Sequence, residues 1–157
     1  MRTTFTASKT APAKVGAIVI PVASSGALPT GLGLNREQLS AIGFDAKCCQ
    51  TTTLPATDKS HVRVLVGIGE VRELNPNVLR NIAAAAARAC SRYESVATSL
   101  ALAGRGEAKV NAQAVVEGFA LALHRWADLK NDKGSLPKLT KVTLLTGDKG
   151  AAVKNGT

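Results

Sequence analysis

The segment Asn111–Lys130 constrains the fold more than any other part of this sequence. It reads NAQAVVEGFALALHRWADLK, and on a helix its apolar side chains would point in nearly every direction. Asn111 belongs to the residue types that cap helix N-termini. Polar residues interrupt the pattern at a spacing that puts them on one narrow stripe, namely Gln113, Glu117, His124 and Asp128. We therefore expect a helix that is buried on most of its sides, between a sheet and another layer.

The remaining periodic segments alternate between strand and helix patterns. Strands are predicted over residues 3–6, 15–22, 46–54, 61–66, 95–102 and 138–145. A short helix is predicted over 36–42 after Asn35, and a longer one from Asn75-Pro76 to Tyr93, with proline at the first helical position. This alternation favours an α/β fold, in which a mostly parallel or mixed central sheet carries helices on both faces.

The composition is typical of one soluble domain. The chain has 157 residues, of which 45% are hydrophobic and 20% charged. A chain of this length can bury a hydrophobic core that is stable without disulfides or a structural metal. No apolar run approaches the roughly 20 residues that span a bilayer. The start, Met1-Arg2-Thr3-Thr4-Phe5, lacks the apolar core of a secretory signal. We expect a cytoplasmic protein without membrane contact.

The cysteines give no sign of a disulfide framework. There are three of them, Cys48, Cys49 and Cys90, and the two adjacent ones fall on a predicted strand. Adjacent side chains on a strand point to opposite faces, so we expect Cys48 and Cys49 not to share a metal or a bridge. Three reduced thiols are the favoured interpretation.

A signature in the apolar segment resembles a known family. Glu117-Gly118, Leu121, Arg125-Trp126 and Lys130 resemble the Glu-Gly-x-x-Leu…Tyr-Arg-Phe…Tyr-Lys signature of the leucyl (cytosol) aminopeptidases, which lies in their N-terminal domain. Differences from that signature are His124 for Tyr, Trp126 for Phe and Leu129 for Tyr.

Two upstream segments agree with the same family in order and spacing. Arg63–Gly69, followed by the predicted helix, is similar to its strand-Gly-x-Gly-helix unit. Gly43-Phe44 and Lys47, before Thr51–Ala56, resemble its Gly-Phe-x-Gly-Lys segment that leads into a Leu-Pro-Ala strand end. The resemblance runs from about residue 15 to the C-terminus.

The resemblance implies a macro-domain-like N-terminal domain of a metallo-aminopeptidase. In this family the catalytic half binds two divalent metal ions, zinc or manganese, and contains an Asn-Thr-Asp-Ala-Glu-Gly-Arg run that is missing from these 157 residues. We therefore expect residues 1–157 to be one non-catalytic domain, with the catalytic domain outside this chain. The whole enzyme would be a hexamer that removes N-terminal amino acids from peptides. This domain would contact the catalytic domain and other subunits, and would help define access to the active sites.

The reactive side chains form no pattern that is typical of a catalytic or metal centre. Of the two histidines, His61 lies on a predicted strand, and His124 precedes Asp128 by one helical turn, a pairing more typical of a surface hydrogen bond. The eleven carboxylates are scattered, whereas a two-metal site needs several that converge. Ser24-Ser25 has no histidine or lysine nearby in a nucleophile motif. We predict no catalytic, cofactor-binding or metal-binding residues in this chain.

Two glycine motifs allow a ligand-binding alternative. Gly67-Ile68-Gly69 follows a strand and precedes a helix, which is the setting of phosphate-binding loops. Arg72 stands where a third glycine would be, so a tight turn is favoured, with an ADP-ribose-type pocket near Gly67–Gly69 as the alternative. Gly31-Leu32-Gly33 is interpreted as a flexible connection.

The net charge of +9 raises the second alternative, a nucleic-acid-binding module. The basic residues concentrate mildly in two places: Arg80, Arg88 and Arg92 on the longer helix, and Lys130, Lys133, Lys138, Lys141, Lys149 and Lys154. An aromatic content of 3% leaves few platforms on which bases could stack. A solvated basic face, or one that pairs with an acidic catalytic domain, is the favoured interpretation.

Overall fold

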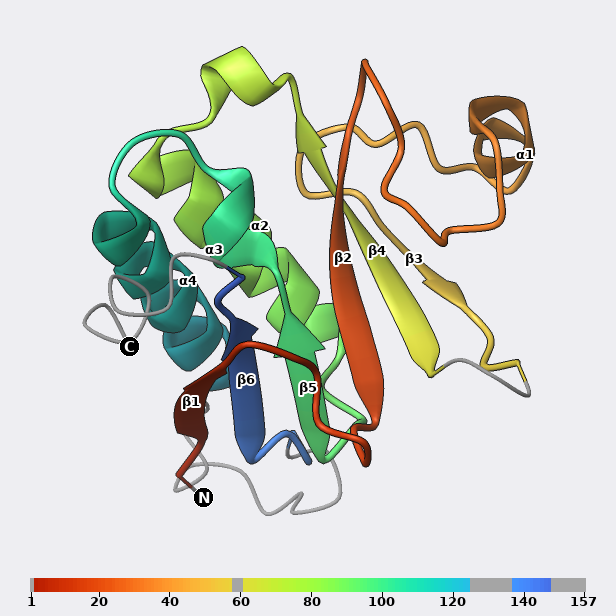
Figure 1. Ribbon diagram of the computed structural model, residues 1–157. Coiled ribbons are helices and arrows are strands. Elements are labelled where there is room, and N and C mark those ends of the chain that lie inside the picture. The colour runs from red at the N-terminus through yellow and green to blue at the C-terminus, as the bar shows by residue number, and fades with distance from the viewer. Residues whose placement is uncertain (1, 58–60, 125–136, 148–157) are drawn as a thin grey trace.

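A six-stranded sheet with helices on both faces forms the fold (Figure 1). The computed structural model describes residues 2–57, 61–124 and 137–147. Its strands are β1 (Thr4–Ser8), β2 (Ala17–Ala23), β3 (Thr51–Leu54), β4 (Val62–Gly69), β5 (Ser95–Thr98) and β6 (Lys141–Leu145). Its helices are α1 (Arg36–Ala41), the 3₁₀ turn η1 (Val71–Glu73), α2 (Pro76–Ala89), α3 (Leu100–Ala103) and α4 (Ala108–Leu123).

The sheet is mixed, with the order β1-β6-β5-β2-β4-β3. All neighbouring strands run parallel except the edge pair β3 and β4, which is antiparallel. The long central strand β2 pairs with β4 on one side and with β5 on the other. Because β2 is covered on both faces, its side chains are apolar in both directions, as the nearly continuous apolar run predicted.

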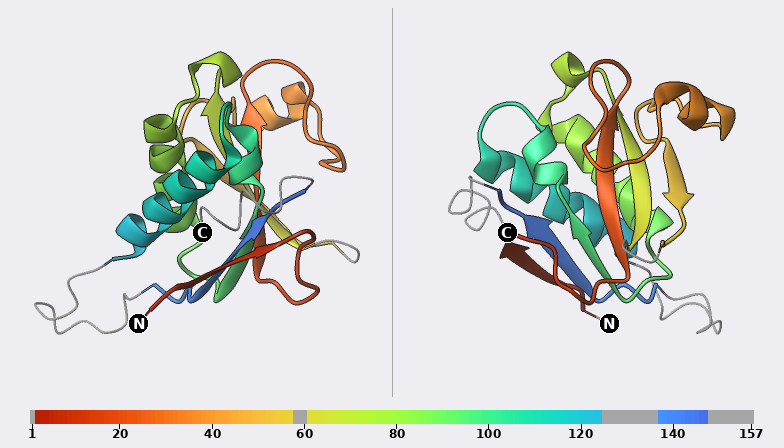
Figure 2. Two further views of the ribbon diagram at one scale, coloured as in Figure 1. Left: turned by 60° about the vertical axis from the view of Figure 1, so that its left-hand side comes forward. Right: turned by 45° about the vertical axis from the view of Figure 1, so that its right-hand side comes forward.

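The two helical layers are unequal (Figure 2). Helices α2, α3 and α4 cover one face, where Val19, Val64, Ile82 and Phe119 belong to the larger hydrophobic core. On the other face, α1 and its flanking loops enclose a smaller core around Val22, Leu39, Phe44 and Leu65. The predicted α/β fold with a mixed sheet and helices on both faces is confirmed. Among the described segments, no helix combines the length and apolar character needed to cross a bilayer.

The two helix caps that short sequence motifs predict, at Asn35 and Asn75, are present in the structure. Asn35 accepts a hydrogen bond from the Gln38 amide at 2.8 Å, and the Gln38 side chain accepts one from the Asn35 amide, which forms a capping box. Asn75 caps α2 by accepting from the Val78 amide at 3.0 Å. Both predicted helix starts are confirmed, although α2 ends at Ala89 rather than at Tyr93.

The prediction of a strand over 46–54 is wrong in its first half. Residues 46–50 form a turn, and β3 begins only at Thr51. Ala46 and Cys49 have φ angles of 56° and 66°, in the left-handed region, which an extended strand cannot accommodate. The expectation that Cys48 and Cys49 point to opposite faces is wrong for the same reason, because their Sγ atoms lie 3.6 Å apart.

Several further boundaries differ from the prediction, and two of these differences concern the type of element or its cap. The strand predicted over 95–102 ends at Thr98, and the buried residues Leu100 and Ala101 belong to the short helix α3. A short apolar run does not distinguish a buried strand from a buried helix. Helix α4 begins at Ala108, so Asn111 is not its cap. Asn111 is instead buried, and its side-chain amide donates to the Arg105 carbonyl at 3.3 Å.

Candidate functional site

The carboxyl ends of the parallel strands form the edge at which α/β folds usually bind ligands. Strands β4 and β5 lie on opposite sides of β2, so the connections diverge there and create a topological switch point. Two motifs singled out in the sequence lie at this edge, Ser24-Ser25 after β2 and Gly67-Ile68-Gly69 at the end of β4. The turn 46–50, where the sequence predicted a strand, lies beside the end of β4.

The Gly67-Ile68-Gly69 amides are already engaged by the protein backbone. Gly67 N–H donates to the Gln50 carbonyl at 2.7 Å, and Gly69 N–H donates to the Ala46 carbonyl at 3.1 Å. A Cβ atom on Gly67 would overlap the Lys47 carbonyl oxygen and lie 2.6 Å from the Ala46 carbonyl carbon. Gly67 therefore lets the turn 46–50 approach the backbone of β4 closely. The amides of Gly67 and Gly69 are not directed at an anion.

Ser24 and Ser25 are held by a carboxylate at the same edge. The Ser24 hydroxyl donates to Oε1 of Glu70 at 2.9 Å, and the Ser25 hydroxyl donates to Oε2 at 3.2 Å. From α1, Arg36 donates to the carbonyls of Ala23 at 3.0 Å and Gly26 at 2.8 Å. These bonds tie the loop after β2 to α1 and to the residue after β4, and none of them activates a serine as a nucleophile.

A depression of about 380 Å³ adjoins this edge, lined by residues that include Arg36, Glu37, Ser40 and Asp45. Its charged groups are of both signs, and Asp45 accepts from the Ser40 hydroxyl at 2.9 Å. Within the described ranges, no three His, Cys, Asp or Glu side chains come close enough together to hold a metal ion. The predicted pairing of His124 with Asp128 lies outside the described residues, because Asp128 falls in the 125–136 gap.

The Glu-Gly signature lies at the contact between α2 and α4. Glu117 on α4 accepts hydrogen bonds from Arg80 Nε at 2.8 Å and from Gln113 Nε2 at 3.0 Å. Arg80 Nη2 lies 2.6 Å from the same carboxylate oxygen, Oε2, and Arg80 Nη1 donates to Asn77 Oδ1 at 2.7 Å. The hydrogen bonds from Gln113 and Arg80 lower the pKa of the Glu117 carboxyl below its ordinary value of 4.5.

Gly118 allows the two helices to touch along their backbones. A Cβ atom at this position would overlap the Arg80 carbonyl oxygen of α2 and would lie 2.7 Å from Ala83 Cβ. The Ala-rich α2 presents small side chains at this contact, so the helices pack closely. Two residues of the signature are thus used in packing: Glu117 bridges the helices and Gly118 sets their separation. Leu121 is 68% exposed, and Arg125, Trp126 and Lys130 lie outside the described residues. The sequence signal for this contact is a glycine inside an apolar helix, directly after the charged residue Glu117.

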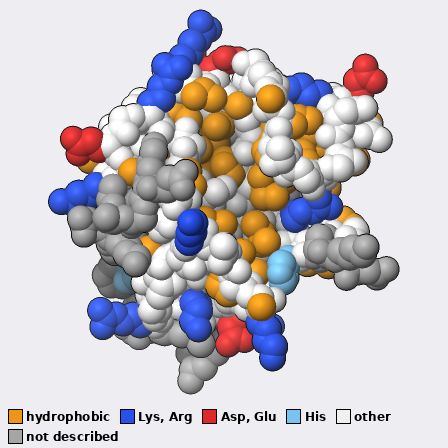
Figure 3. All heavy atoms as spheres, in the orientation of Figure 1, with side chains coloured by type: hydrophobic (Ala, Val, Ile, Leu, Met, Phe, Trp, Pro, Cys, Tyr) orange, Lys and Arg blue, Asp and Glu red, His pale blue; other side chains and the backbone are white. Residues whose placement is uncertain are grey.

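The structure describes the predicted basic concentrations only in part. Arg80 is paired with Glu117, and Arg92 lies over the Tyr93 ring at 5.0 Å and donates to its hydroxyl at 2.8 Å. Lysine and arginine side chains are spread around the face shown in Figure 3 and do not gather in one patch there. Four of the six predicted lysines lie outside the described residues: Lys130, Lys133, Lys149 and Lys154.

A sequence profile of the cytosol aminopeptidase family, N-terminal domain, matches residues 23–133. This range runs from the end of β2 through the whole of α4 and includes Glu117-Gly118. The chain belongs to the cytosol aminopeptidase family. The family resemblance read from the sequence is confirmed, and the matched region is the family's N-terminal domain.

Curated relatives of the family extend far beyond this chain. A probable cytosol aminopeptidase of Rhodococcus jostii is 35% identical over 101 residues, which are 63% of this chain and 19% of that protein. A probable cytosol aminopeptidase of Corynebacterium diphtheriae is 30% identical over 158 residues, covering 92% of this chain and 30% of that protein. The chain therefore spans less than a third of the length of these relatives.

Solved structures of similar fold agree with this family membership. The bottromycin maturation enzyme BotP matches with a TM-score of 0.68 and 25% identity, over 91% of this chain and 30% of that chain. BotP has also been solved in complex with Mn. A mutant tomato leucine aminopeptidase matches with a TM-score of 0.65 and 17% identity, over 98% of this chain and 35% of that chain. At that identity the tomato enzyme supports the fold alone.

Proposed function

We propose that this chain is the non-catalytic N-terminal domain of a metal-dependent aminopeptidase that removes N-terminal amino acids from peptides. The observation that carries the proposal is the use of the signature residues. Glu117 and Gly118, two residues of the family signature, form the contact between α2 and α4. A signature that builds a helix interface supports a scaffold role for the domain.

The chemistry would then be supplied by a domain outside this chain. That domain would bind two divalent ions, zinc or manganese, which polarise the peptide carbonyl and activate a water molecule. Support comes from the length of the relatives, of which this chain covers 19% to 30%. The protein would act in the cytoplasm, with peptides as its substrates.

The role of the domain itself would be architectural. In the whole protein it would contact its own catalytic domain and contribute to the subunit contacts of a hexamer, where it would help define access to the active sites. The mixed sheet covered by α2–α4 and by α1 supplies a framework for such contacts.

Two measurements on the full-length protein test this proposal. Light scattering coupled to size-exclusion chromatography should give the mass of six subunits. Release of leucine from a leucyl peptide should require added Mn²⁺ or Zn²⁺ and stop with a chelator. A chelator-treated enzyme with full activity would contradict the metal-dependent assignment, and a monomeric mass would contradict the role in hexamer assembly.

A further inference from the structure

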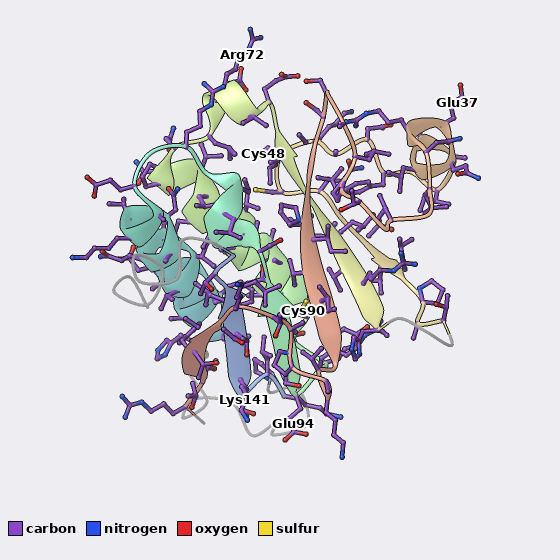
Figure 4. All side chains as sticks on the ribbon, in the orientation of Figure 1. Glu37, Cys48, Arg72, Cys90, Glu94 and Lys141 are labelled. Atoms are coloured by element: carbon purple, nitrogen blue, oxygen red, sulfur yellow. The ribbon has the colours of Figure 1, made fainter. Side chains whose placement is uncertain are left out.

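The thiol groups of the two adjacent cysteines in the turn 46–50 take no part in the hydrogen bonds of the sheet or in the proposed function. Cys48 is exposed and Cys49 is half-buried, and both are free thiols. Their Sγ atoms lie 3.6 Å apart. Figure 4 shows Cys48 on the turn beside the end of β4, well away from Cys90, which lies at the far end of α2.

The backbone holds this pair in place. Cys49 N–H donates to the Gly67 carbonyl at 3.0 Å, and Gln50 N–H donates to the Lys47 carbonyl at 2.9 Å. The Gly67 and Gly69 amides bind the same turn from β4. The left-handed conformation of Cys49, with φ of 66°, turns its side chain to the same side as that of Cys48. The two sulfur atoms are therefore presented together on an anchored turn.

The spacing suits a bridging atom better than a direct bond. Adjacent Cα atoms are about 3.8 Å apart across a trans peptide, whereas ordinary disulfides join Cα atoms about 4.4–6.8 Å apart. A direct disulfide would therefore strain the turn. A single atom bonded to both sulfur atoms holds them farther apart than the roughly 2.05 Å of a direct S–S bond. The observed Sγ–Sγ distance of 3.6 Å leaves room for such a bridging atom.

The number of available ligands selects the class of bridging atom. A structural zinc ion takes four ligands, and in the part of the chain that the structure describes no third Cys, His, Asp or Glu completes a metal site. A monosubstituted trivalent arsenical, R–As(OH)₂, needs only two thiols. We propose that Cys48 and Cys49 form a bidentate binding site for a trivalent arsenical of this kind.

The reaction is a condensation that needs no oxidant or reductant. Two As–O bonds break and two As–S bonds form, and each hydroxide leaves as water with the proton of one thiol. Arsenic stays trivalent throughout. The exposed Cys48 reacts first, because burial raises the pKa of the Cys49 thiol to about 11 and keeps it protonated at neutral pH. Cys49 then closes the ring within the same molecule, at a high effective concentration.

Intact mass spectrometry of the reduced chain with equimolar phenylarsine oxide tests this site. We expect one phenylarsenic group per chain with the loss of two hydrogens. The adduct should persist in excess glutathione, a monothiol, and should be removed by 2,3-dimercaptopropanol, a dithiol. Cys48→Ser and Cys49→Ser should each weaken binding by about 100-fold, the gain that chelation typically provides.

Cys90→Ser is the matched control, because Cys90 is buried and away from the turn. This variant should bind phenylarsine oxide like the unchanged chain. Equal adduct formation by Cys48→Ser and the unchanged chain would overturn the proposal, as would the absence of an adduct from the unchanged chain. Thermal melting followed by circular dichroism checks that each variant is folded, and Cys48→Ala provides a second replacement at the exposed position.

Discussion

Arg80 on α2 and Glu117 on α4 are joined by two contacts to one carboxylate oxygen, at 2.8 Å from Nε and 2.6 Å from Nη2. The side chains are 34% and 37% exposed, so this bridge lies at the rim of the helix contact and not in its core. Directly beside this bridge, the missing side chain of Gly118 lets the Arg80 carbonyl approach α4 closely. An ion pair and a close backbone contact therefore hold the same turn of α2 against α4.

The bridge predicts a pH-dependent contribution to stability. The folded pKa of Glu117 is depressed, so the carboxylate stabilises the fold at neutral pH, and this contribution is lost as the pH falls below 4.5 through the depressed pKa. Glu117→Gln should therefore lower the free energy of unfolding at pH 7, and the difference should shrink toward pH 3. Urea unfolding at a series of pH values measures it.

Glu37→Gln, which removes an exposed carboxylate on α1, is the control for the change in net charge. A difference for Glu117→Gln that is the same at pH 7 and pH 3 would contradict the role assigned to the bridge.

Gly118→Ala tests the close packing of α2 and α4, because packing and helix propensity predict opposite changes in the free energy of unfolding. Propensity alone would stabilise α4 by about 1 kcal/mol. The added Cβ would instead overlap the Arg80 carbonyl oxygen, and overpacking of this kind costs about 1–3 kcal/mol. We expect net destabilisation in denaturant unfolding, whereas a stabilised variant would show that α2 and α4 do not touch here. Ala120→Gly, on the exposed side of α4, calibrates the propensity term.

Ala46 stands where the related family segment has glycine, and its φ of 56° explains that preference. Ala46→Gly relieves a left-handed conformation that costs about 1–2 kcal/mol, but it removes a buried methyl group. We expect the two effects to nearly cancel. Ala86→Gly, at a buried position inside α2, has no such relief and should cost about 1 kcal/mol or more. Equal losses in thermal unfolding would contradict the strain assigned to Ala46.

The thiols should differ sharply in reactivity. Burial raises the pKa of the Cys90 thiol to about 12, so little of its reactive thiolate exists at pH 8. Alkylation with iodoacetamide, followed by peptide mass spectrometry, should label exposed Cys48 first and Cys90 only after unfolding in guanidinium. Labelling of Cys90 in the native chain at the rate of Cys48 would contradict its burial at the end of α2.

Features with a local cause were predictable from the sequence. The caps at Asn35 and Asn75 depend on residues within three positions, and the alternating valines of β4 reveal its period directly. The turn 46–50 was not predictable in this way, because Ala46 and Cys49 adopt positive φ angles that non-glycine residues rarely take. Its position is set by hydrogen bonds to Gly67 and Gly69, which lie on another strand.

The pairs of residues that meet at the contact between α2 and α4 also could not be predicted from neighbouring residues in the sequence. The Glu-Gly signature was recognised, but Arg80 lies 37 positions before Glu117, and no periodicity links the two. The residue type of Asn111 predicts a helix cap, whereas its buried side chain donates to the Arg105 carbonyl and packs against Gly104. The expected absence of a catalytic centre in this chain stays a prediction.

The central claim is that this domain supplies framework while another segment of the protein performs the chemistry. The most direct test incubates the purified 157-residue chain with leucine 4-nitroanilide and Mn²⁺ or Zn²⁺, beside the full-length protein at equal molarity. The account predicts metal-dependent release of 4-nitroaniline by the full-length protein and none by the chain above the rate with metal alone. Chelator-sensitive release by the isolated chain would contradict it.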